Sequence, residues 1–255
     1  RWISAIWARQ LVASPSQRGV DPTALWQLVG LDPADPDPML RLPDEVHLRL
    51  WTEVMRRLGD PAFPLDYAAH MRIDDYDALG LACKTAENVA VALERIVRYL
   101  RIWTNSVELT LDYAPDGVRL RLARDGIRDV GYRAAMESAL AEVLHAVSGL
   151  AGQRLVAENV ELAHAHADIP SSRHREFFGV TPEQACHEYA LTLARSVLVQ
   201  PLALTDAELS QFLLEHLERL ATTSNAERPF EERVIDAISR ELPSGAPHAS
   251  RTSST

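Results

Sequence analysis

The fold class is decided by residues 107–122, which read VELTLDYAPDGVRLRL. Apolar and polar residues alternate on both sides of a Pro-Asp-Gly turn at 115–117, and this alternation is typical of strands with one buried face. Turns of this composition connect the two strands of a β-hairpin. Residues 106–123 therefore predict an antiparallel hairpin, so the protein contains sheet as well as helix.

On both sides of the hairpin the spacing of apolar residues changes to every three or four positions, which is helical. The helix before the hairpin carries Val89, Leu93 and Ile96 on one face, and the helix after it, at 130–150, has a continuous apolar stripe. Further helical patterns cover most of residues 1–71. The N-terminal half is therefore predicted to be mainly helical.

Two later segments are candidates for the rest of the sheet. Residues 155–163 alternate in the manner of a strand. Residues 181–193 can be interpreted in two ways. Thr181 and Pro182 resemble a helix start, because proline is favoured at the first helical position, whereas the alternation from Tyr189 onward is that of a strand. The local pattern alone slightly favours the helix for this second segment.

Composition bounds the class of protein. The chain has 255 residues, of which 47% are apolar and 24% charged, as in an ordinary soluble globular protein. Its net charge of −10 argues against a broad nucleic-acid surface, which needs clustered lysine and arginine. No apolar run approaches the ~18 residues that span a bilayer, and there is no signal-peptide layout. We therefore expect a cytoplasmic protein without membrane contact.

Two amphipathic helical patterns and a short tail end the chain. The first follows Asp206 and carries an apolar stripe formed by Leu209, Phe212, Leu213, Leu217 and Leu220. A polar joint at 222–225 separates it from a second pattern at 228–242. The wide apolar face of the first helix is a candidate dimer contact, and packing on its own domain is the equal alternative.

One short motif has the residue types of a metal site. His164, His166 and Asp168 alternate along the chain, and on a strand such residues share one face. Two imidazoles and a carboxylate at that face could hold the metal ion of a small metal-dependent hydrolase. Against this interpretation, no other histidine or acidic cluster completes the site, and Pro170 marks the end of the strand. The hydrolase is therefore the alternative function, and no cofactor is predicted.

Catalytic motifs of other kinds are missing from the sequence. No serine lies in the glycine-flanked elbow of hydrolases, and no glycine-rich phosphate loop occurs. Glu137 and Glu142 share the predicted helix at 130–150, but five positions apart they do not face each other. We therefore do not expect an enzyme.

A ligand pocket beside the hairpin is the better-supported site. Aromatic residues lie on the helices next to the hairpin, and small-molecule pockets are mostly apolar with a few polar anchors. The candidate effector-binding residues are Trp51, Arg98, Tyr99, Trp103, Tyr132 and His145. Plain core packing is the competing interpretation for most of these side chains.

A series of short motifs occurs in order along nearly the whole chain. The motifs are GLDP (30–33), LRLW (48–51), ALGLA (78–82), TAENVAVAL (85–93), RYL (98–100), VELAH (160–164), EFFGV (176–180) and LVQPL (198–202). In this order they resemble the N-terminal regulatory domain of AraC/XylS-type bacterial transcription regulators. The similarity is greatest to the subgroup of ornithine- and arginine-responsive activators.

The resemblance implies a domain plan and a function. It favours a strand at 186–193, which makes the fold α+β with a small, mostly antiparallel sheet. It implies an effector-binding domain at 1–203, a dimerisation helix and hinge at 204–225, and the truncated start of a helix-turn-helix DNA-binding domain at 226–255. The chain is then the sensing portion of a homodimeric regulator that binds a small-molecule effector. Such a regulator contacts DNA only through reading helices that this chain does not contain.

Overall fold

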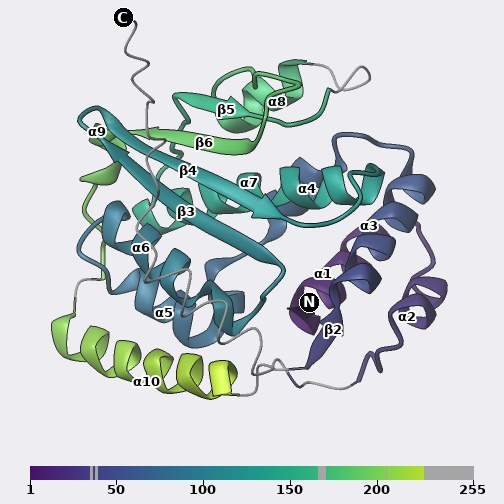
Figure 1. Ribbon diagram of the computed structural model, residues 1–255, viewed down its shortest axis with the longest axis horizontal. Coiled ribbons are helices and arrows are strands. Elements are labelled where there is room, and N and C mark those ends of the chain that lie inside the picture. Colours follow the sequence, from purple (N-terminus) through teal and green to yellow (C-terminus); the bar gives the residue numbers. More distant parts are fainter. Residues whose placement is uncertain (35–36, 38–39, 166–170, 205, 227–255) are drawn as a thin grey trace, which may run out of the picture.

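The computed structural model describes residues 1–34, 37, 40–165, 171–204 and 206–226. Within these residues the chain combines helices with two small antiparallel sheets, which confirms the predicted α+β class. Figure 1 shows the larger sheet lying across helix α7 (Val130–Ala151), with the N-terminal helices gathered to one side of it. The C-terminal helix α10 (Ala207–Ala226) runs along another edge of the molecule.

The larger sheet has the strand order β3–β4–β6–β5 and is antiparallel throughout. β3 (Val107–Ala114) and β4 (Gly117–Arg124) form the hairpin. β6 (Tyr189–Ala194) pairs with β4, and β5 (Asn159–Glu161) pairs with β6. The hairpin predicted at 106–123 is confirmed, because the period of two places the apolar residues of both strands on one face and the short turn between Ala114 and Gly117 fixes the register.

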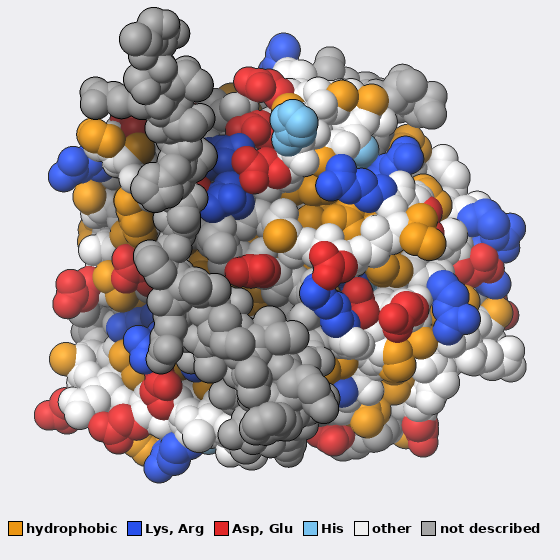
Figure 2. Space-filling model, in the orientation of Figure 1, with side chains coloured by type: hydrophobic (Ala, Val, Ile, Leu, Met, Phe, Trp, Pro, Cys, Tyr) orange, Lys and Arg blue, Asp and Glu red, His pale blue; other side chains and the backbone are white. Residues whose placement is uncertain are grey.

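The two faces of β4 differ in chemistry. Its apolar residues are buried beneath the sheet, and the arginines between them lie on the opposite face. Arg119 pairs there with Glu161 at 2.8 Å and with Glu188 at 2.7 Å. Arg121 pairs with Asp112 of β3 at 2.5 Å. Figure 2 shows acidic and basic side chains side by side over the sheet, so these arginines form ion pairs rather than a basic surface for nucleic acid.

Most of the remaining chain is helical. The bounds are α1 (Ala5–Ser16), α2 (Thr23–Val29), α3 (Asp44–Leu58), α4 (Phe63–His70), η1 (Ile73–Tyr76), α5 (Asp77–Lys84), α6 (Val89–Tyr99), η2 (Leu100–Ile102), α8 (Ser171–Phe178) and α9 (Arg195–Leu198), where η denotes a 3₁₀ helix. The mainly helical N-terminal half agrees with the sequence pattern. Side-chain caps begin several helices; Asn88, for example, accepts a hydrogen bond from the Val91 N–H at 3.0 Å at the start of α6.

Helix α7 lies at the centre of the domain. Asp129 caps it by accepting a hydrogen bond from the Tyr132 N–H at 2.9 Å, and Gly152 ends it in the left-handed conformation at φ 64°. α7 packs against α3 and α4, and the sheet crosses it on another side. A helix covered from several sides is apolar nearly all round. The two acids on α7, Glu137 and Glu142, are therefore its exceptional residues.

A second sheet ties the N-terminus to the segment before α3. β1 (Trp2–Ser4) pairs with β2 (Arg41–Pro43), and the Arg41 guanidinium lies 4.0 Å from the centroid of the Trp2 ring. The local pattern predicts helix from Trp2 onward. The structure differs because the partners of β1 come from distant parts of the chain, as in the 2.7 Å hydrogen bond from the Ser4 N–H to the Trp103 carbonyl.

The strand predicted at 155–163 is shorter than expected. Only Asn159–Glu161 pairs with β6. Before it, the Ala157 N–H donates to the carbonyl of Phe178 at 2.8 Å, so Ala157 is hydrogen-bonded to the end of α8 rather than to the sheet. The helix that the local pattern favours in residues 181–193 is wrong for its second half, where pairing with the distant strands β4 and β5 makes a strand. The strand expected from the family resemblance is confirmed, although it begins at Tyr189 rather than at residue 186.

Helix α10 begins after Asp206, whose carboxylate accepts a hydrogen bond from the Leu209 N–H at 3.0 Å. The apolar stripe of the helix is divided between two environments. Leu213 and Leu217 are buried against the same chain, whereas Leu209 and Phe212 are 38% and 61% exposed. Leu220 is partly buried at the edge of the core. Packing of α10 on its own domain is thus observed for the inner half of the stripe.

The end of α10 differs from the sequence pattern. The helix continues through residues 222–225, where the sequence predicts a hinge. The second amphipathic pattern at 228–242 and the tail lie outside the described residues, as does nearly all of the domain start predicted at 226–255. Among the helices that are described, none has the length and apolar character needed to cross a bilayer.

Candidate ligand-binding cavity

A cavity of about 110 Å³ lies between α7, α1 and the buried face of the hairpin. Helices α3, α4, α5 and α6 and both 3₁₀ helices contribute to its wall. The hairpin register brings Leu109 opposite Leu122 on this wall. Because the rest of the lining is mostly aliphatic and aromatic, the cavity suits a small ligand with a largely apolar body.

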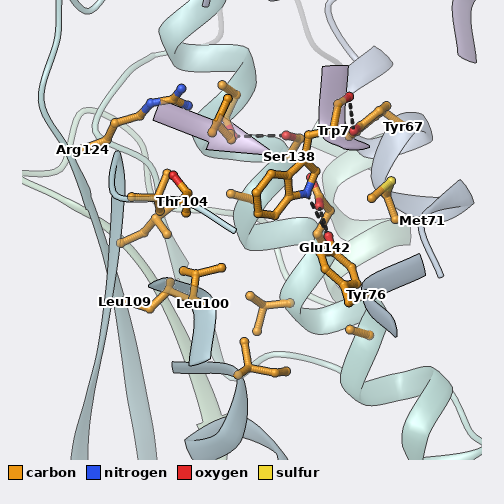
Figure 3. Close-up of a pocket in the computed structure, with 18 of the residues that line it drawn as sticks. Trp7, Tyr67, Met71, Tyr76, Leu100, Thr104, Leu109, Arg124, Ser138 and Glu142 are labelled. Atoms are coloured by element: carbon orange, nitrogen blue, oxygen red, sulfur yellow. Dashed lines mark hydrogen bonds between the residues drawn. The ribbon is translucent and has the colours of Figure 1, made fainter. Parts of the chain in front are cut away.

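A chain of hydrogen bonds at one end of the cavity leads to Glu142 of α7. The indole N–H of Trp7 donates to the Tyr76 hydroxyl oxygen at 2.9 Å, and that hydroxyl donates to the Glu142 Oε2 at 3.2 Å. Figure 3 shows the three side chains meeting on one side of the cavity. Burial raises the pKa of the Glu142 carboxyl to about 7, although hydrogen bonding to Tyr76, Ser138 and Trp7 acts in the opposite direction.

A buried ion pair lies at the other end of the cavity, where β4 meets α3. Arg124 donates to the Asp44 Oδ1 at 2.5 Å and to the His47 Nδ1 at 3.2 Å. Burial and the adjacent arginine lower the pKa of His47 well below its usual value, so its ring is neutral. Its Nδ1 therefore accepts the hydrogen bond from Arg124. The charge at this end is therefore already compensated within the protein.

The second cation of the cavity wall, Arg72, is also paired. It contacts Asp74 at 3.1 Å, and its side chain is 73% exposed. Within the described parts of the chain, Glu142 has no lysine, arginine or histidine partner. The wall thus presents one carboxyl group that lacks a counter-ion to an otherwise apolar space.

The effector-binding residues predicted from the sequence fall into three places. Trp51 is fully buried and lines the cavity. Trp103 and Tyr132 lie behind wall residues: the Trp103 ring packs edge-on against Tyr76 at 6.4 Å, and the Tyr132 hydroxyl donates to the Arg124 carbonyl at 2.8 Å. These two side chains support the wall without forming it.

The other three predicted residues lie farther from the cavity. Arg98 and Tyr99 both reach Glu218 of α10, at 2.5 and 2.8 Å. His145 is half-buried on α7, and its pKa is lowered by burial and by the nearby charge of His70. The structure therefore brings Arg98 and Tyr99 together at the contact between α6 and α10.

Sequence analysis missed the polar residues of the cavity. Trp7, Tyr76 and Glu142 come from three separate parts of the chain, and no local pattern connects them. One signal was present for Glu142, because an acid within a helix that is apolar nearly all round needs either a partner or a function. The expectation that Glu137 and Glu142 do not face each other is confirmed, since they have different neighbours.

Glu137 belongs to a second polar cluster on α7. Its Oε1 lies 2.8 Å from the His174 Nε2, and its Oε2 lies 3.4 Å from the His164 Nε2. The His164 Nδ1 is 2.8 Å from the Tyr189 hydroxyl. All four side chains are buried.

The metal-site hypothesis concerns the neighbourhood of this cluster. His164 is engaged by Tyr189 and Glu137. His166 and Asp168 lie outside the described residues. In the part of the chain that is described, no group of three histidine, cysteine, aspartate or glutamate side chains is suited to hold a metal ion.

Comparisons with known proteins agree on one kind of domain. Residues 19–202 match the model of the arabinose-binding domain at the N-terminus of AraC transcription regulators. Among solved structures, the transcriptional regulator CdpR from Pseudomonas aeruginosa superposes with a TM-score of 0.61 at 17% identity, over 94% of this chain and 72% of that one. At this identity the likeness shows a shared fold. A search of proteins of curated function finds no match.

Proposed function

The chain belongs to the family of N-terminal arabinose-binding domains of AraC transcription regulators, and from this premise we propose that it binds a small-molecule effector in the cavity beside α7. The single observation that carries the proposal is the mostly apolar cavity at the centre of the domain, with one carboxyl group on its wall that has no counter-ion among the residues the structure describes. The ornithine- and arginine-responsive subgroup, suggested by the sequence motifs, remains a prediction.

A route from the cavity to α10 supports a regulatory role. Ile96 of α6 and Leu100 of η2 line the cavity, and Tyr99 between them donates a hydrogen bond to Glu218 of α10 at 2.8 Å. A ligand that prefers one arrangement of α6 and α10 shifts the population toward that arrangement, by no more than its difference in affinity for the two. In this proposal the position of α10 is the output of effector binding.

Homodimer formation is part of the proposal, and it is assigned to the outer face of α10. Leu209 and Phe212 are exposed there, whereas the inner residues Leu213 and Leu217 are covered by the same chain. Sedimentation of Phe212→Glu tests this assignment. A folded monomer is expected, and a dimer of unchanged stability would exclude this face.

DNA recognition is assigned to a helix-turn-helix unit that follows α10 in the complete regulator. The support is the family membership together with the net charge of −10, which does not suit a phosphate-binding surface on this portion. Two helix-turn-helix patterns in the coding sequence after residue 255 are the expected finding. A coding sequence without such patterns would mean that the protein is a ligand-binding module that does not act through helix-turn-helix DNA binding.

The effector site is tested by filling the cavity. Ala139 lines the cavity on α7, whereas Ala151 at the end of the same helix does not. A ligand present at about 100 times its Kd stabilises the chain by about 2.7 kcal/mol, which corresponds to a rise in Tm of roughly 5 to 10 °C. We expect Ala139→Leu to abolish this rise and the matched control Ala151→Leu to keep it. A compound that stabilises both variants equally binds elsewhere.

A further inference from the structure

The direction of the hydrogen bonds defines what the cavity offers to a ligand. The Trp7 N–H donates to Tyr76, which donates to the carboxylate of Glu142. Both protons therefore point along the chain toward Glu142, and its carboxylate is the final acceptor. A ligand group that approaches this carboxylate from the cavity interacts best as a hydrogen-bond donor.

The carboxyl group also lacks compensating charge. A carboxylate that is removed from water without a cation is costly, and a protein normally supplies a lysine, arginine or histidine partner. In the described residues both arginines of the cavity wall are paired with aspartates, Arg124 with Asp44 and Arg72 with Asp74. A cationic ligand group would supply the missing counter-ion for Glu142.

Aromatic rings surround the same end of the cavity. The Trp7 and Tyr76 rings lie edge to face with centroids 5.8 Å apart, and Tyr67 borders the cavity from α4. Ammonium groups are attracted to the faces of such rings. A carboxylate flanked by indole and phenol rings therefore suits an ammonium group better than a neutral hydroxyl.

The remainder of the wall limits what else the ligand can carry. Away from Glu142 the lining is mostly hydrocarbon, and its other charges are already paired. A sugar would leave several hydroxyl groups without partners, and an amino acid would leave its carboxylate without a cation. The volume of about 110 Å³ is below the ~150 Å³ of an engineered cavity that accepts benzene, so the apolar body is small.

We infer that the effector of this cavity is a small primary amine with a branched or cyclic hydrocarbon body, whose ammonium group pairs with Glu142 beside the Trp7 and Tyr76 rings. This inference rests on the proposed function, because it names the ligand class of the same site. The Glu142 carboxylate and the Tyr76 ring hold the ammonium group, and the wall from Leu109 to Trp51 encloses the hydrocarbon.

The protonation state of Glu142 gives the inference a direct readout. The carboxyl has a pKa of about 7, and an alkylamine remains protonated to about pH 10. The nearby titratable groups are Tyr67 and Tyr76, whose pKa values burial raises, so both stay neutral. His145 follows one turn later on α7, and the proximity of Asp75 also raises the pKa of both tyrosines. Amine binding then requires the carboxyl to lose its proton.

The test is titration calorimetry with three probes of one skeleton: 3-methylbutylamine, 3-methylbutan-1-ol and 4-methylpentanoate. On the unaltered chain we expect the amine to bind at least tenfold more tightly than the alcohol at pH 8. Its affinity should fall by up to about tenfold per pH unit below pH 7. This pH series depends on no variant and so cannot be confused with a folding defect. In Glu142→Gln the preference for the amine should fall below about threefold.

Other outcomes overturn the inference. Equal binding of the alcohol, tighter binding of the carboxylate, affinity that rises toward pH 6, or no binding of the amine would each exclude the amine class. The proposed function fails separately, and only if compounds that stabilise the chain bind Ala139→Leu and Ala151→Leu alike. If the carboxylate probe binds at pH 6 and its binding is lost in Ala139→Leu, the proposed effector site stands and the proposed ligand class is replaced.

Discussion

Two acids on α7, five residues apart, have different surroundings. Glu137 is fully buried and shares its two oxygens between His174 at 2.8 Å and His164 at 3.4 Å. Glu142 is half-buried, faces a cavity, and accepts a hydrogen bond from one tyrosine hydroxyl at 3.2 Å. The helix, the residue type and the apolar neighbours in sequence are the same, so the difference arises from what packs against each face.

The difference separates two uses of a buried carboxyl group. A carboxylate enclosed by ring nitrogens is satisfied within the fold, and such a network fixes how the elements around it pack. A carboxyl group beside empty space without a counter-ion destabilises the fold unless a ligand supplies one. Glu137 therefore holds α8 and the segment after β5 against α7, whereas Glu142 is available to a ligand.

The largest expected effect comes from removing Glu137. Glu137→Ala takes away the acceptor shared by His164 and His174 and leaves a space beneath them, at an expected cost of about 4 kcal/mol in the free energy of unfolding. Urea denaturation at pH 7 measures the loss. The matched variant Glu142→Ala should cost less than about 1 kcal/mol, because no cationic partner is left behind. Equal losses would show that the two acids serve the same purpose.

The next effect is a dependence of stability on pH that belongs to Glu142 alone. Its pKa is about 7 in the folded chain and near its usual value of 4.5 when unfolded. Between these values the folded state binds more protons than the unfolded state, so its stability falls as pH rises. The difference between the two pKa values corresponds to about 3 kcal/mol in the free energy of unfolding, which is lost as the pH rises from roughly 4.5 to 7.

Urea titrations from pH 4.5 to 8 compare the chain with Glu142→Gln, which keeps the shape of the side chain and cannot ionise. The variant should be as stable as the unaltered chain near pH 4.5 and more stable by about 3 kcal/mol at pH 8. A variant that follows the same pH curve as the unaltered chain would mean that Glu142 is ionised throughout, and the contrast with Glu137 would then be wrong.

The smallest effect distinguishes the two tyrosines. Tyr189→Phe removes the hydroxyl partner of His164, and Tyr76→Phe removes the donor to Glu142; each should cost about 1 kcal/mol. Only Tyr76→Phe should also move the pH dependence of stability to higher pH, because the Tyr76 hydrogen bond lowers the pKa of Glu142. Unfolding curves at pH 6 and 8 measure this shift, which Tyr189→Phe should not produce.

The outline of the fold could be predicted from the order of residues. The hairpin and the long helix α7 follow from periods of two and of about 3.6, because each period places all apolar side chains on faces that must be buried. The ends of the helices and strands could not be predicted where their hydrogen-bond partners come from distant parts of the chain. The strand at 155–163 is shortened by its contact with α8, and β1 forms only because residues 41–43 return to it.

The candidate site was predicted far less completely. The aromatic side chains next to the hairpin indicated a pocket, and Trp51 does line the cavity. Arg98 and Tyr99 instead contact Glu218, since helix α10, more than a hundred residues later, packs against α5 and η2 beside them. The polar side of the cavity joins Trp7, Tyr76 and Glu142 from three segments, and no spacing within one segment can show such a meeting.

The sequence by itself determined the class of fold, the period of each long element and membership of a regulator family, because these depend on local patterns and on motif order. Only the tertiary structure decided which acid of α7 is enclosed by two histidines and which faces the cavity. That decision depends on the packing of α1, η1 and α8 around one helix, and packing couples residues that are far apart along the chain. The two carboxyl groups of α7 are alike in sequence and differ in chemistry for that reason.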